Sequence, residues 1–195
     1  MSQDLHAEIV LARAIHDVAD FVDPAGWGAA PQLFALVPTA DLVAAEPALA
    51  DQVNTADELT PVAQDPLPDE VVDGTIPLDE FLATTSWPAT VAGCVLVQEI
   101  VVLPPDAEND LDAALTPLLA DADAADAAGR AAAQAHPQRR DARLFAAAQR
   151  GGNSLCLLQL RPEDPDTNAP LDLRTHPDLA PNLVEALLHT LEETG

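Results

Sequence analysis

The sequence predicts an α+β fold, with a mostly antiparallel sheet of about five strands and helices packed on it at both ends of the chain. The run Val91–Leu103 is apolar except for Gln98 and Glu99, which is typical of a strand covered on both faces. Residues 142–160 have the pattern of a hairpin, and amphipathic segments open and close the chain. The 195 residues suit a single domain over residues 1–195.

The first helix is predicted over Asp4–Val22, because apolar residues recur there at three- and four-residue steps. A strand follows at Gln32–Val37 and ends at Pro38. Thr39 is expected to cap a short helix that stops near Glu46, before the next proline. The core-facing residues of the first helix are then Leu11, Ile15, Val18 and Val22, with Val10, Ala14 and Phe21 beside them.

Residues 51–76 carry a weaker signal, with many acids and several prolines, and are expected to form a mobile acidic loop. Within them, Leu59–Gln64 has the pattern of an edge strand, because Pro61 is tolerated at an edge and not in the centre of a sheet. Pro77 suits the first turn of a short helix over Leu78–Thr85.

Beyond the central run, residues 106–120 are expected to form a loop and a broken helix, and Ala122–Ala135 is helical by propensity. Ala142–Gln149 and Leu155–Leu160 are predicted as a hairpin, because residues 150–154 between them are rich in glycine.

The end of the chain combines a long polar connection with a helix. Residues 162–180 are punctuated by prolines and are expected to form a second mobile acidic loop. Pro181–Glu193 is predicted as an amphipathic helix whose core-facing residues are Leu183, Leu187, Leu188 and Leu191.

Charge excludes several classes of partner. All eight basic residues are arginine, and they face 33 acids for a net charge of −25. Binding of phosphate backbones or anionic membranes rests on cations, so we expect no nucleic-acid and no membrane partner. The start of the chain has neither the positive charge nor the apolar run of a secretory signal, which predicts a cytoplasmic protein.

The basic residues are concentrated in one region. Residues 130–161 hold six of the eight arginines and a single acid, whereas residues 1–129 hold 24 acids and one arginine. This basic island could neutralise acids of the same chain, form an interface, or bind an anion.

No catalytic, cofactor-binding or metal-binding motif is present in the sequence, so we expect no catalytic residue, no cofactor and no metal. A P-loop or a lysine Schiff base would need the lysine that this chain lacks. Cys94 and Cys156 lack the CxxC spacing and are predicted as buried thiols that could be neighbours across the sheet.

Glu99 is a charged residue in an otherwise largely apolar strand. A buried carboxylate needs a partner or it holds its proton, and the nearest candidates are the hairpin arginines Arg143 and Arg150. Together with Trp27 and Trp87, these residues are the candidate pocket or interface.

Three segments carry a resemblance to a known family: Asp23–Gly28 (DPAGWG), Pro31–Thr39 (PQLFALVPT) and Trp87–Cys94 (WPATVAGC). With them the chain resembles a family of uncharacterised actinobacterial proteins, known by a Propionibacterium acnes hypothetical-protein name. The similarity covers most of the chain and is weakest at residues 51–76 and 162–176. It implies no activity. The order of elements is also similar to that of type III secretion chaperones, which are small acidic dimers, but fold alone does not fix function.

These observations favour a non-enzymatic, acidic protein-interaction module of chaperone-like type that forms a homodimer and binds another protein. The alternative is an enzyme or small-ligand binder with a pocket near Glu99 and the 142–161 hairpin. A third hypothesis, an acidic inhibitor that mimics nucleic acid, rests on net charge alone.

Overall fold

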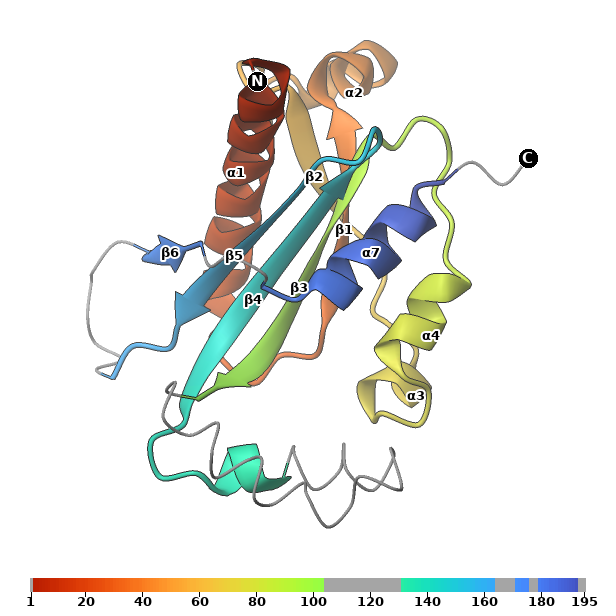
Figure 1. Cartoon of the computed structure of the whole chain (residues 1–195). Coiled ribbons are helices and arrows are strands. Elements are labelled where there is room, and N and C mark those ends of the chain that lie inside the picture. Colours follow the sequence, from red (N-terminus) through yellow and green to blue (C-terminus); the bar gives the residue numbers. More distant parts are fainter. Residues whose placement is uncertain (1, 104–130, 164–170, 176–178, 193–195) are drawn as a thin grey trace.

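A computed structural model describes residues 2–103, 131–163, 171–175 and 179–192 (Figure 1). Its centre is a six-stranded sheet in which all neighbouring strands are antiparallel, in the order β2-β1-β3-β4-β5-β6. The predicted α+β class with a mostly antiparallel sheet is therefore confirmed. In chain order the strands are β1 Gln32–Pro38, β2 Leu59–Ala63, β3 Gly93–Val102, β4 Arg140–Gln149, β5 Ser154–Leu160 and β6 Leu173–Arg174.

Helices cover both faces of the sheet (Figure 1). The long first helix packs on one face, and helices from the middle and the end of the chain pack on the other. They are α1 Ser2–Val22, α2 Thr39–Ala45, α3 Asp69–Val72, α4 Leu78–Ala83 and α7 Pro181–Thr190, with 3-10 turns η1 Asp23–Ala25 and η2 Pro47–Leu49. No helix in the described part of the chain is both long and apolar enough to cross a bilayer.

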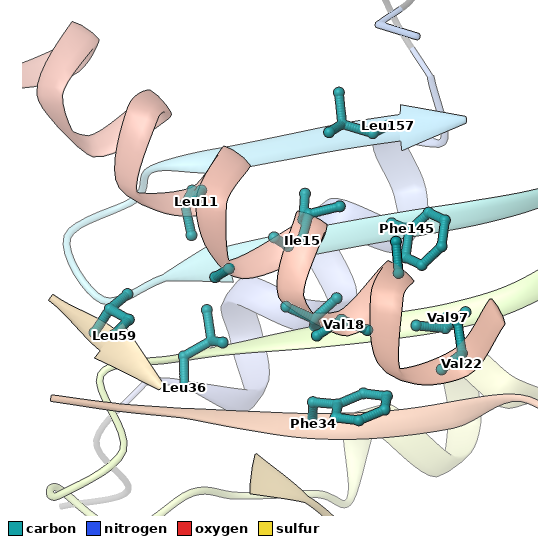
Figure 2. Packing of buried hydrophobic residues seen from close by; sticks show 14 of the residues in the cluster. Leu11, Ile15, Val18, Val22, Phe34, Leu36, Leu59, Val97, Phe145 and Leu157 are labelled. Atoms are coloured by element: carbon teal, nitrogen blue, oxygen red, sulfur yellow. The ribbon is translucent and has the colours of Figure 1, made fainter. Parts of the chain in front are cut away.

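The central apolar run forms β3, which has helices on both of its faces. Its side chains alternate, so Val95 and Val97 belong to the cluster beneath α1, and Cys94 and Leu96 to the cluster beneath α7. Figure 2 shows the α1 cluster, where the helix packs on residues of five strands, β1 to β5. The predicted strand covered on both faces is therefore confirmed. The labelled residues of Figure 2 are Leu11, Ile15, Val18, Val22, Phe34, Leu36, Leu59, Val97, Phe145 and Leu157.

The hairpin also forms as predicted. β4 and β5 pair from Ala142↔Leu160 to Ala148↔Ser154, and both turn glycines have positive φ, 96° at Gly151 and 93° at Gly152. Such backbone angles favour glycine, which explains why the chain reverses there. The two-residue strand β6, which pairs with β5, was not predicted.

Several local expectations were wrong. Phe21 is 63% exposed and only its ring edge meets Phe34, at a centroid distance of 5.8 Å. Thr39 makes no helix-capping bond; its hydroxyl lies 2.9 Å from that of Thr60 on β2, because the start of α2 packs beside that strand. Residues 65–74, expected as loop, contain α3 and bury Leu67 and Val71, since these apolar side chains fill the core beneath α7.

The two cysteines are not neighbours. Cys94 lies opposite Ala148, and Cys156 lies opposite Ala146, so β4 separates β3 from β5. Of the predicted helix over Ala122–Ala135, only residues 131–135 are described, and they are helical. The predictions for residues 106–120 lie outside the described residues.

Candidate functional site

The structure divides the predicted site residues between the two faces of the sheet. Glu99, Arg143 and Trp27 lie together beyond the end of α1, whereas Arg150 and Trp87 lie at the end of α7. They do not surround a common pocket. We call the first group, with Asp23 and Gln159, the turn cluster, and the second, with Thr190 and Cys94, the helix-end cluster.

Strand register builds the base of the turn cluster. Glu99 of β3 lies directly opposite Arg143 of β4, and Arg143 lies directly opposite Gln159 of β5. Side chains in such positions point to the same face, at a separation of about 5 Å. Three polar side chains therefore form a row across an otherwise apolar face, just past the last turn of α1.

This row holds the turn that follows α1. Arg143 donates from Nη2 to the Gly26 carbonyl at 2.6 Å and from Nη1 to Gln159 Oε1 at 3.1 Å. Gln159 in turn donates to Asp23 Oδ1 at 3.1 Å.

Glu99 fixes the next residues of the same turn. Its carboxylate accepts the Gly28 N–H at 2.8 and 2.9 Å and the Ala29 N–H at 3.2 Å. Two successive backbone N–H groups that converge on one carboxylate form an anion-binding arrangement. Here the protein's own side chain occupies it.

Arg143 is a buried cation. Its side chain is 2% exposed, and its guanidinium lies 3.7 Å from Asp23 and 3.9 Å from Glu99. Its Cζ also lies 4.4 Å from the centre of the Trp27 ring, within the range of a cation–π contact. Burial lowers the pKa of Arg143, while Glu99 and Asp23 raise it. Arginine keeps its charge in proteins, so these partners compensate a charge that is held away from water.

The turn cluster has almost no free space. A cavity of about 10 Å³ lies beside it, with Glu99, Arg143, Gln98 and Gln32 among its walls. A volume of this size is enough for about one water molecule. The predicted pairing of Glu99 with a hairpin arginine is present, and the cavity that the described residues form beside it is too small for a substrate.

The helix-end cluster is organised around Arg150, which follows the last residue of β4. Its Nε donates to the Val91 carbonyl at 2.8 Å, and its Nη2 donates to the carbonyls of Trp87 and Pro88 at 3.0 and 3.1 Å. Its Nη1 donates to the carbonyl of Leu191, just beyond α7. A cation at this position satisfies terminal carbonyls and interacts favourably with the helix dipole.

Trp87 and Thr190 complete the attachment of α7. The indole Nε1 donates to Thr190 Oγ1 at 3.0 Å, and that hydroxyl donates to the Leu187 carbonyl at 2.6 Å. The Trp87 backbone N–H also donates to the Thr190 carbonyl at 3.2 Å. These bonds join α7 to the segment that leads into β3.

The cysteines are free thiols without nucleophilic character. Burial raises the pKa of Cys94 to about 12 and that of Cys156 to about 11. The thiolate is the reactive form, so both side chains stay protonated near neutral pH. Within the described residues, no group of three His, Cys, Asp or Glu side chains could hold a metal ion.

Sequence reasoning missed Gln159 and Thr190. Gln159 could have been found, because counting back from the glycine turn places it opposite Arg143 and thus on the face of Glu99. Thr190 gave no such signal: it meets Trp87 across 103 positions of the chain.

Comparison with known proteins gives a family and no individual relative. No curated protein matches the chain, and no solved structure matches it. A family model described as PPA1309-like protein matches residues 11–192, a span that includes both clusters, and the chain therefore belongs to the PPA1309-like protein family.

Proposed function

We propose that this protein is a non-enzymatic, acidic protein-interaction module of the cytoplasm, which forms a homodimer and binds another protein. One observation carries the proposal. The side chains best suited to chemistry are engaged with groups of their own chain, whereas two larger recesses lie on either side of α7, and the one beside β5 is lined mostly by apolar residues.

The two recesses beside α7 are open to solvent and adjoin each other. One has a volume of about 590 Å³ and lies between α7 and the start of β5; the other has about 530 Å³ and lies between α7 and α4. Apolar residues that remain partly accessible on a folded protein are a common feature of interaction sites. Those that line the first recess are Leu155, Cys156, Leu179, Pro181, Val184 and Leu188.

Dimerisation is supported by the outer face of α1. Leu5 and Ile9 lie one helical turn apart and are 59% and 47% exposed. A second copy that covered these side chains would remove them from water. The basic island, in contrast, gives little support for an interface. Three of its arginines, Arg143, Arg150 and Arg161, already bond within the chain.

The small-ligand alternative has less support. Its predicted location was the space between Glu99 and the hairpin, where the cavity volume is only about 10 Å³. Ligand pockets usually enclose several hundred cubic ångströms.

Two measurements test the proposal. Light scattering on the purified full chain, at micromolar concentration and moderate salt, should give the mass of a dimer, and an L5Q/I9Q double variant should give that of a monomer. Affinity purification from the native host with mass spectrometry should then recover a partner that rebinds when both proteins are pure. A monomeric wild type without a stoichiometric partner would contradict the proposal.

A further inference from the structure

We infer that the recesses beside α7 form one docking surface for a basic amphipathic helix of a partner protein. This inference rests on the proposed function and specifies the surface and the chemistry of the partner. We call this surface the α7 groove; it is lined by Glu8, Asp79, Ala83, Ser154, Leu155, Cys156, Thr175, Leu179, Pro181, Asn182, Val184, Glu185, Ala186, Leu188, His189 and Glu192.

The two recesses adjoin along the outer side of α7. Glu185 and Leu188 line both of them, and these residues lie three positions apart on the same helical face. Leu188 is half-buried, so one side of it packs on the core and the other remains accessible. A ligand that contacts this ridge can therefore reach both recesses.

The α7 groove is apolar on the side of β5 and carries acidic residues on both sides of α7. The apolar contribution comes from Val184, Leu188 and their neighbours on β5. Four carboxylates line the groove, those of Glu8, Asp79, Glu185 and Glu192, and no arginine lines it among the described residues. His189, the histidine among the described lining residues, has Nδ1 2.9 Å from Glu192.

This combination selects the chemistry of the occupant. An amphipathic helix places apolar anchors at three- and four-residue steps into such a groove, and basic residues on its other face would meet the acidic rim. Nucleic acid and anionic lipid are repelled by the same carboxylates. A second copy of this chain fits the rim less well than a basic helix does, because its Arg143, Arg150 and Arg161 already bond within their own chain.

The groove is preorganised. Arg150 and Trp87 bond to the end of α7, and Leu187 and Leu191 are buried beneath it. Because α7 is held from below, binding need not order it, which lowers the entropic cost of association.

The inference can be tested with three fluorescein-labelled peptides of about 18 residues, or about five helical turns. The first has leucines on one helical face and lysines on the other, the second replaces the lysines with glutamates, and the third has the first composition in a non-amphipathic order. Fluorescence anisotropy with the full chain, at low and at moderate salt, should show saturable binding of the first peptide only.

Matched variants locate the binding. Glu185→Arg should weaken binding of the basic amphipathic peptide by about tenfold or more, and Val184→Ser should weaken it without changing the charge. Glu46→Arg at the end of α2 makes the same charge change outside the groove and should leave affinity within about twofold. Thermal unfolding of each variant confirms that it is folded.

Three results would overturn the inference: equal binding of the amphipathic and the non-amphipathic basic peptide, equal effects of Glu185→Arg and Glu46→Arg, or no binding of the basic amphipathic peptide. A change of oligomeric state in Glu185→Arg would also overturn it, because the groove would then be a self-interface. These outcomes leave the proposed function open to its own test, since a native partner could still bind elsewhere on the chain.

Discussion

Arg143 links three strands and a turn through a single side chain. It lies between Glu99 and Gln159 in the sheet and bonds to the carbonyl of Gly26 above it. Because Glu99 is a carboxylate in an apolar strand, the sequence predicted that it contacts a hairpin arginine. The proline and glycines after α1 predicted a turn, but its contact with these two side chains gave no signal, because the turn contributes only backbone groups to it.

Replacing Arg143 should therefore be costly. Arg143→Met removes the buried cation beside Glu99 and Asp23 and the side-chain donor to the Gly26 carbonyl, so the free energy of unfolding should fall by about 3 kcal/mol. Urea denaturation measures this. Arg174→Met is the control, because its pair with Asp172 is exposed and is worth less than about 1 kcal/mol. Equal losses in the two variants would contradict a structural role for the turn cluster.

Glu99 gives a second test at the residue scale. Glu99→Ala removes the charged acceptor of the Gly28 and Ala29 N–H groups and a carboxylate 3.9 Å from the buried Arg143, which should cost about 2 kcal/mol of unfolding free energy. Acetate supplies a carboxylate, so it should restore part of the lost thermal stability, whereas chloride at equal ionic strength should not. Glu46→Ala, at an exposed position, should respond equally to both salts. Equal responses in Glu99→Ala would show that the carboxylate is not held as described.

At the scale of elements, α7 depends on a residue from the hairpin turn. Its apolar stripe explains why it lies on the sheet, but Arg150 and Trp87 fix where its end lies. This division follows from the interactions involved: burial of leucines is not directional, whereas hydrogen bonds to carbonyls require a defined position.

Loss of Arg150 should loosen α7 selectively. Arg150→Gln should lower the free energy of unfolding by about 2 kcal/mol and speed hydrogen–deuterium exchange in α7 more than in β3. Mass spectrometry of exchanged peptides gives both rates. Arg174→Gln, which breaks an exposed pair with Asp172, should leave the exchange of α7 unchanged. Unchanged exchange in Arg150→Gln would mean that leucine burial alone holds the helix.

The backbone of β4 leaves no space for a side chain at Gly93 of β3. A Cβ atom there would lie 2.6 Å from the Ala148 carbonyl oxygen and 3.3 Å from Gln149 Cα, both of them backbone atoms. Gly93→Ala should therefore cost about 2 kcal/mol through displaced strands. Chemical denaturation should show this loss, whereas Ala63→Ser at the exposed end of β2 should change stability by less than about 0.5 kcal/mol. A neutral Gly93→Ala would show that the strands can separate locally.

At the scale of the whole molecule, charge is the dominant property. The net charge of −25 favours solubility and opposes the compact state by self-repulsion. Among the described arginines, Arg143 and Arg150 are occupied internally, so the acids on the surface have few cations near them.

Salt should therefore stabilise the protein. Raising NaCl from about 0.01 M to about 0.5 M shortens the Debye length severalfold, and the melting temperature should rise by a few degrees, or about 1–2 kcal/mol. Differential scanning calorimetry measures the rise, and KCl should give the same curve because screening depends on ionic strength. A melting temperature that stays constant or falls with salt would contradict net self-repulsion.

The sequence by itself determined the α+β class, the strand β3 with a helix on each face, the β4–β5 hairpin and the two amphipathic helices. These follow from apolar periodicity and turn residues, which act over a few positions. Only the tertiary structure placed Glu99 and Arg143 on one face and Arg150 and Trp87 at the other end of the sheet. It also brought Gln159 to Asp23 across 136 positions, because such contacts depend on how distant elements pack.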